Sequence, residues 1–181
     1  MIVLGDPPEA WERLGFAVQD GVIALEGEEL RLTGEGGGIL EITAPGVTAD
    51  EPDGLTLKQP QRGQTPLRDV EGSAHPNGAS VVDHVVVVTG SLDRTVAALQ
   101  AAGLDLRRQL PGMAFLRLGP YILEVVERGG DPARFWGLVV VVPDPGAVPG
   151  AGPAKDAVQP GRRIATVRGL GTELALMSPR V

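Results

Sequence analysis

The sequence predicts an α+β protein made of repeated βαβββ modules. The order strand, helix, then three strands occurs within residues 1–44, occurs again within 81–128, and returns in degenerate form within 135–178. Glycine and proline number 26 and 16, and they punctuate short apolar runs. That pattern is typical of many short strands joined by turns, not of a disordered chain. Internal repeats of this length usually indicate duplicated supersecondary units that share one core.

The first module opens with a short strand and a helix start at residues 6–9, Asp-Pro-Pro-Glu. Asp6 is predicted to cap this helix, because a proline in the first turn and an acid three residues after the cap are helix-start signals. Trp11 and Leu14 would face inward, and Gly15 would end the helix. Extended segments are predicted at Phe16–Val18, Val22–Leu25, Glu29–Leu32 and Gly38–Thr43.

The second module has the same order with clearer signals. Its first strand, Val81–Thr89, contains four consecutive valines, which is typical of a buried strand. Ser91 is predicted to cap a helix that runs through Ala102 and stops at Gly103. Three strands follow: one from Leu104, one at Met113–Leu118 and one at Tyr121–Val126.

Residue-level similarity supports the pairing of these two modules. In the first, Leu-Arg-Leu at 30–32 precedes Ile-Leu-Glu-Ile at 39–42. In the second, Leu-Arg-Leu at 116–118 precedes Ile-Leu-Glu-Val at 122–125. The spacers differ by three residues, a difference that a glycine-rich turn absorbs.

The remaining segments are a weaker third copy and a connection. At the helix position of the third copy, residues 143–153 are rich in proline and glycine, so we expect a loop or a short helical turn there. Residues 45–80 are predicted to be a linker that partly drapes over the surface, unless Gly54–Leu57 adds a short strand. Strands of the third copy are predicted at 138–142, 163–168 and 172–177.

Charge and composition exclude several function classes. The net charge is −7, divided into −9 over residues 1–60 and +2 over 61–181. An acidic first third without a compensating basic run disfavours nucleic-acid binding, as does an aromatic content of 3%. The absence of cysteine excludes disulfides, thiolate metal sites and a cysteine nucleophile. No run reaches the roughly 18 apolar residues of a membrane helix, and the start lacks the features of a signal peptide, so we expect a cytoplasmic protein.

The second module combines Asp83-His84, the valine strand after it, the Ser91 helix and the strand Ile122–Val125. In this combination it resembles the vicinal oxygen chelate superfamily. This superfamily includes glyoxalase I, extradiol dioxygenases and bleomycin-resistance proteins. More narrowly, His75–Ala79 and Gln159–Arg163 are similar to segments of bacterial glyoxalase-like domain proteins. The resemblance implies a glyoxalase-like domain over 81–181, whose paired modules curl mainly antiparallel sheets around an open cleft.

The resemblance also implies a set of site residues. Family metal ligands come from the first and fourth strands of each module, positions that fall on His84 and Glu124 in the second module and on Glu41 in the first. One imidazole and two carboxylates suit Fe²⁺, Mn²⁺, Ni²⁺ or Zn²⁺, with Glu124 also the catalytic group that moves a proton. The third module has Ala175 where a ligand would stand.

Further candidates are residues that would contact a bound ligand. Tyr121 and Trp136 are candidates for lining the cleft, with ordinary core packing as the alternative. Arg163 is the candidate for recognising an anionic group, although alternation along a strand sends only one of Arg162 and Arg163 inward. His75 lies in a turn and serves either as an extra ligand or as a cap of backbone groups.

Three functions agree with these residues. The first is a metal-dependent glyoxalase-like lyase, isomerase or dioxygenase that acts on a small oxygen-bearing molecule. The second is a metal-free module that binds or sequesters such a molecule, and the third is a structural remnant without chemistry. The metal hypothesis depends on whether Glu41 converges with His84 and Glu124. Sheet edges and the spare third module also predict a homodimer.

Overall fold

The structure is a computed structural model that describes residues 1–60 and 72–180. Residues 61–71, part of the predicted linker, lie outside the described residues, as does residue 181. The described chain forms an α+β fold with two mixed sheets, one of eight strands and one of five. The predicted fold class is therefore confirmed.

The second and third modules together build the eight-stranded sheet. Its order is β11-β12-β13-β10-β6-β9-β8-β7. Each module places its first strand beside its fourth in parallel, and the two first strands, β6 and β10, pair antiparallel at the centre. The strands are β6 (Val82–Thr89), β7 (Asp105–Leu110), β8 (Met113–Leu118), β9 (Tyr121–Glu127), β10 (Arg134–Val141), β11 (Lys155–Asp156), β12 (Arg163–Val167) and β13 (Glu173–Met177).

The first module forms the five-stranded sheet, in the order β2-β3-β1-β4-β5. Its elements follow the predicted order, but β1 lies between β3 and β4 and runs antiparallel to β4. The sheet topology therefore differs from that of the other two modules. β5 comes from the predicted linker, which agrees with the alternative of a short added strand. The elements are β1 (Ile2–Leu4), α1 (Pro8–Glu12), β2 (Val22–Leu25), β3 (Glu28–Leu32), β4 (Ile39–Thr43) and β5 (Leu57–Lys58).

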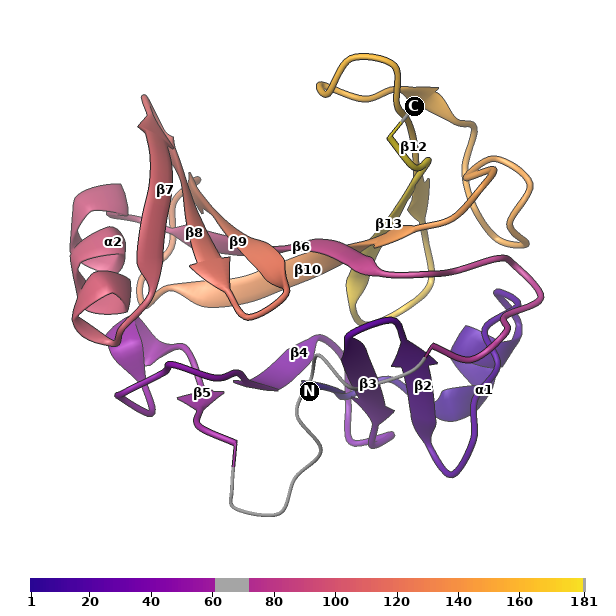
Figure 1. Cartoon of the computed structure of the whole chain (residues 1–181), viewed down its shortest axis with the longest axis horizontal. Helices are drawn as coiled ribbons and strands as arrows, with labels where there is room; N and C mark the ends of the chain where they lie inside the picture. The colour runs from indigo at the N-terminus through magenta and orange to yellow at the C-terminus, as the bar shows by residue number, and fades with distance from the viewer. Residues whose placement is uncertain (61–71, 181) are drawn as a thin grey trace.

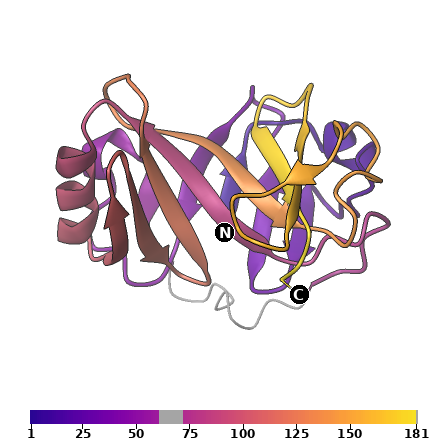
Figure 2. The same cartoon turned by 90° about the horizontal axis from the view of Figure 1, so that it is seen from above.

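The eight-stranded sheet curls, with β7–β9 rising on one side and β12 on the other, and the five-stranded sheet lies beneath it (Figure 1). Seen from above, β6 and β10 cross the middle of the molecule (Figure 2). Alternation along the strands distinguishes the two faces. Val85 and Leu123 are completely buried, whereas their neighbours His84, Ile122 and Glu124 are only partly buried. We call the face that carries these three residues the open face.

A buried carboxylate joins the first and third modules. Asp6 does not cap α1 as predicted, because the helix has Pro7 at its N-cap and no side-chain cap. Instead, Asp6 accepts hydrogen bonds from the backbone N–H groups of Gly171 and Thr172. The loop before β13 also packs backbone against backbone at Gly37, where a Cβ would lie 2.5 Å from the Cα of Gly171. Side chains larger than hydrogen are therefore excluded from this contact.

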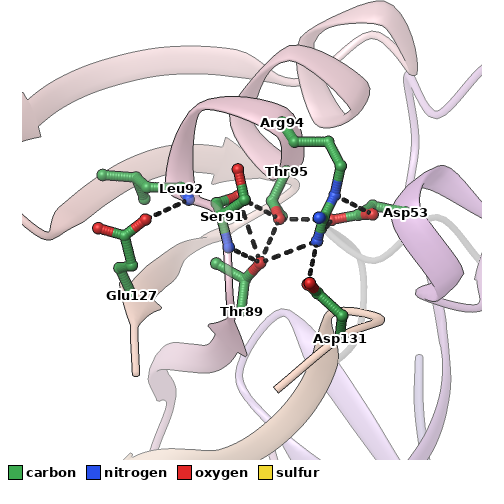
Figure 3. Close-up of polar contacts among 8 residues, drawn as sticks. All are labelled: Asp53, Thr89, Ser91, Leu92, Arg94, Thr95, Glu127 and Asp131. Atoms are coloured by element: carbon green, nitrogen blue, oxygen red, sulfur yellow. Dashed lines mark hydrogen bonds and ion pairs between the residues drawn. The ribbon is translucent and has the colours of Figure 1, made fainter. Parts of the chain in front are cut away.

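The helix α2 (Leu92–Ala101) is held at its N-terminus by side chains from other segments (Figure 3). Ser91 occupies the predicted N-cap position, but its side chain makes no cap hydrogen bond. The N–H of Leu92 donates to the Glu127 carboxylate at 3.0 Å instead. Arg94 lies between Asp53, in the 3₁₀ helix η1 (Pro52–Gly54), and Asp131, and its hydrogen bond to Asp131 lowers the pKa of that carboxyl. This cluster ties the linker to the eight-stranded sheet.

The predicted loss of the third crossover helix is confirmed. Residues 142–154, all of them described, contain turns and bends between β10 and β11 and no helix. Within the part of the chain that the structure describes, neither helix has the length and apolar character needed to cross a membrane.

Candidate functional site

A β-bulge at Asp83 shapes the candidate site. On β10, Val139 pairs with His84 and Val140 pairs with Val82, so Asp83 has no partner in the ladder. A bulge of this kind changes the direction in which the extra side chain points. Here it allows Asp83 and His84, adjacent in sequence, to contact each other: His84 Nδ1 lies 2.8 Å from Asp83 Oδ2.

Glu124 meets His84 from the neighbouring strand. In the parallel pair β6–β9, Glu124 is opposite Val86, two residues beyond His84 on the same face. The carboxylate Oε2 of Glu124 lies 3.4 Å from Nε2 of His84. The structure thus brings together two of the three predicted metal ligands, with side-chain exposures of 12% for His84 and 21% for Glu124.

Behind Asp83 lies Arg162, whose side chain is 3% exposed. Its Nη1 donates to Asp83 Oδ1 at 2.6 Å and also to the Gln159 side chain, while its Nε donates to the Ser178 carbonyl at 2.7 Å. Burial on its own would raise the pKa of Asp83, but hydrogen bonds from His84 and Arg162 outweigh it and lower the pKa to about 2. Asp83 is therefore ionised throughout the physiological range.

The His84–Glu124 pair has apolar neighbours on the open face. Ile122 is directly across from His84 on β9, and Phe115 is directly across from Glu124 on β8. Val86 and Val139 complete the surroundings on β6 and β10. A few polar groups among apolar side chains are the usual composition of a small-molecule site, where the polar groups orient the ligand.

Glu41, the third predicted metal ligand, is not part of this group. It lies on β4 of the five-stranded sheet, where its carboxylate accepts hydrogen bonds from Lys58 and Thr43. The first module covers the face of the eight-stranded sheet opposite the open face, since β4 packs on β10 there. The second and third modules thus share the sheet that carries the open face, and the third contributes Ala175 at its fourth-strand position.

The predicted metal does not fit the residues present. In catalytic sites, divalent metals such as Fe²⁺, Mn²⁺, Ni²⁺ and Zn²⁺ are bound by three or more protein ligands. Among the described residues, no group of three His, Asp or Glu side chains is arranged to hold a metal ion. His84 and Glu124 supply two, and Asp83 is already engaged by Arg162. These residues therefore support no chemical step through a metal.

The three residues predicted to contact a ligand differ in burial and in the direction of their side chains. Tyr121 is 2% exposed, on the face of β9 that the first module covers, and burial raises the pKa of its hydroxyl, with the charge of Glu28 adding to the effect. Trp136 is 39% exposed at a second bulge, on β10. Arg163 points outward and contacts the Ala154 carbonyl.

His75 has the structural role. Its Nδ1 accepts a hydrogen bond from the N–H of Ala17 at 3.0 Å, and its Nε2 lies 3.1 Å from the Ala24 carbonyl. It thereby ties the turn at residues 75–78 to the first module. Burial lowers the pKa of His75, an effect that the bond to Ala24 partly opposes. The alternative of a backbone cap is confirmed, and both ring nitrogens are already engaged.

Sequence reasoning gave Asp83 no role of its own, and it considered Arg162, like Arg163, only for recognition of an anionic group on a ligand. The signal was present in two motifs quoted for the family resemblance, Asp83-His84 and the Pro-Gly-Arg-Arg turn ending at Arg163. The alternation rule correctly allowed only one of the two arginines to point inward. The choice of Arg162 follows from its contact with Asp83, which is 79 residues away in the chain.

Comparison with known proteins gives no match to any family model and none to a curated protein. Among solved structures, a xylose isomerase-like TIM barrel/4-hydroxyphenylpyruvate dioxygenase fusion protein aligns with 98% of this chain at a TM-score of 0.57 and 9% identity. The chain spans 48% of that protein.

Two further similar structures are enzymes. Methylmalonyl-CoA epimerase from Mycobacterium tuberculosis aligns over 57% of this chain and 90% of its own, at 17% identity and a TM-score of 0.42. Glyoxalase I from Zea mays aligns over 97% and 64%, at 14% identity and a TM-score of 0.42. At these identities the likeness concerns the fold alone. The alignment of the fusion protein over 98% of this chain supports the α+β fold with paired βαβββ modules that the sequence predicts.

Proposed function

We propose that this protein binds a small oxygen-bearing molecule on the open face of the eight-stranded sheet, without a metal ion. The observation that carries the proposal is the His84–Glu124 pair, 3.4 Å apart and surrounded by apolar side chains. Both groups form hydrogen bonds with oxygen functions of a ligand, while Ile122, Phe115 and Val86 provide apolar contact.

A second candidate function is proton transfer on the bound molecule. It is favoured by the juxtaposition of a carboxylate and an imidazole on the same face, since such a pair passes a proton between a substrate and the protein. In this version Glu124 is the catalytic group that contacts the substrate, and His84 is its partner. Binding is common to both candidates, so binding is tested first.

The metal-dependent lyase, isomerase or dioxygenase is the competing hypothesis. It requires Glu41 to leave Lys58 and to move from the covered side of the sheet to the His84–Glu124 pair. Replacement of Glu41 by Gln therefore discriminates between the two. Under the metal hypothesis this variant loses a metal ligand, and under our proposal it leaves ligand binding unchanged.

The experiment is a thermal-shift screen of small hydroxy and oxo acids, with and without EDTA. A ligand at 100 times its dissociation constant stabilises the native state by roughly 2.7 kcal/mol, which is readily detected as a rise in Tm. We expect the shift to be insensitive to EDTA and to disappear in Glu124→Gln. Glu173→Gln is the matched control, because Glu173 is an exposed carboxylate on the open face, across from Gly137.

Two outcomes would contradict the proposal. The first is a shift abolished by EDTA and restored by a divalent metal, which would support the metal hypothesis. The second is the absence of any shift over the whole screen, which would favour a structural remnant.

The homodimer and the cytoplasmic location stay parts of the proposal. Light scattering of the purified protein tests whether it forms a dimer.

A further inference from the structure

The two histidines of the chain have opposite hydrogen-bonding environments. Asp83 is ionised, so its carboxylate only accepts hydrogen bonds, and the 2.8 Å contact requires a proton on Nδ1 of His84. His75 accepts from a backbone N–H at Nδ1, so its proton is on Nε2. The neutral rings therefore carry their protons on different nitrogens.

We infer that Asp83 and Arg162 are positioning residues that fix His84 in the Nδ1–H tautomer, so that the site presents two hydrogen-bond acceptors to a ligand. With Nδ1 protonated, the lone pair of Nε2 is left beside Glu124, whose Oε2 is 3.4 Å away. Two acceptors at this distance do not bind each other. A ligand group with a proton to donate forms a hydrogen bond with one of them.

The ligand class follows from this arrangement and rests on the proposed function. The site takes a molecule with a hydroxyl group, which donates to one acceptor of the pair. An ether oxygen in place of the hydroxyl only accepts, so it meets two acceptors and is disfavoured. A buried polar group without a partner carries a substantial cost, so the discrimination between a hydroxyl compound and its ether is strong.

Arg162 contributes by holding Asp83 in place. Its guanidinium is 3% exposed and has three side-chain or carbonyl partners, one of them Asp83. A buried arginine that makes several directed hydrogen bonds cannot be replaced by lysine without loss of that geometry. The arginine thus fixes the carboxylate, the carboxylate fixes the tautomer, and the tautomer fixes which nitrogen faces the ligand.

The test is ¹⁵N NMR of the imidazole nitrogens in the ligand-free protein at about pH 8.5. We expect the long-range ¹⁵N–¹H pattern of His84 to show a protonated Nδ1, and that of His75 to show a protonated Nε2. His75 is an internal reference, since it lies in the same molecule and is fixed by backbone groups. A His84 ring that carries a proton on Nε2, either alone or together with one on Nδ1, would overturn the inference.

Two variants extend the test. In Asp83→Asn and Arg162→Lys we expect the His84 signals to shift toward a mixture of tautomers, while the His75 signals stay unchanged. Asp156→Asn, at a carboxylate that is 95% exposed, is the control and leaves both histidines unaltered. Unchanged His84 signals in both variants, provided that they fold, would show that Asp83 and Arg162 have no positioning role. The wild-type measurement stands even if a variant does not fold.

The ligand class is tested separately with lactate and its O-methyl ether as probes. We expect lactate to shift the His84 resonances and its ether to shift them at least tenfold less at the same concentration. Equal shifts would refute the hydroxyl requirement. A failure of both probes, with the tautomer as expected, would contradict the proposed function and leave the positioning role intact, so the two failures are distinguishable.

Discussion

The contacts of Asp83 with His84 and Arg162 make a quantitative prediction about stability. Asp83 has an ordinary pKa of 3.8 and a pKa of about 2 in the folded protein. Each unit of difference is worth about 1.36 kcal/mol, so the ionised form contributes about 2 kcal/mol to the free energy of unfolding at pH 7. Asp83→Asn removes this contribution and leaves the buried guanidinium without its carboxylate.

The pH dependence gives the prediction its sign. Because the pKa is lowered on folding, the contribution of Asp83 is fully present above its unfolded pKa of 3.8 and is lost as the pH falls toward 2. The free energy of unfolding of the wild type should therefore exceed that of Asp83→Asn by about 2 kcal/mol at pH 7 and by only about 1 kcal/mol at pH 3. The gap narrows with acid because the carboxyl of Asp83 takes up its proton at a higher pH in the unfolded chain, where its pKa is 3.8, than in the folded protein.

The measurement is urea denaturation of both proteins at pH 7, 4 and 3, followed by circular dichroism. Asp156→Asn is again the matched control, since its carboxylate is exposed and should change stability by less than about 0.5 kcal/mol. Equal stability of Asp83→Asn and the control at pH 7 would refute the argument from the buried ion pair. A gap that does not change with pH would mean that packing, and not charge, is responsible.

Two further predictions concern other contacts. In Gly37→Ala the new methyl group lies 2.5 Å from the Cα of Gly171, so we expect the free energy of unfolding, measured by thermal denaturation, to fall by about 1–3 kcal/mol. Gly146→Ala is the control with a small expected effect, because its new methyl group lies 3.3 Å from the Cβ of Ala154. A fall in Tm no larger than that of the Gly146 control would contradict the backbone contact. The pKa of His75 is lowered in the folded protein, so near pH 6 the unfolded chain binds more protons than the folded protein does. The free energy of unfolding of the wild type should therefore fall as the pH drops below about 6.5. This dependence on pH should be weaker in His75→Asn. An unchanged slope would show that His75 is not held neutral.

The strands and helices were predictable because they follow from local patterns. β8 runs over Met113–Leu118 as predicted, and β6 starts one residue later than predicted. Valine runs, glycine stops and Leu-Arg-Leu alternation act within a few residues of the chain and need no distant partner. The helix caps were less predictable, because Asp6 has partners more than 160 residues away in the sequence.

The candidate site was predictable in part. His84 and Glu124 meet because both positions belong to one module, where the pairing of β6 with β9 follows from the repeat. The contact of Asp83 with His84 depends on a bulge, which arises from the register between β6 and β10. No pattern within a single strand specifies that register, so the acid behind the histidine could not be assigned from sequence.

By itself, the sequence determined the α+β class and the repeated modules, since both depend on the order and spacing of residues along the chain, and its resemblance to a known superfamily pointed to His84 and Glu124. Only the tertiary structure decided which modules share a sheet. Glu41 occupies an equivalent position in the repeat, yet it binds Lys58 on another sheet, while the third module joins the second along β6 and β10. Equivalent repeats have equivalent local patterns. The choice between them therefore depends on packing between distant segments, such as Asp6 with Thr172 and Gly37 with Gly171.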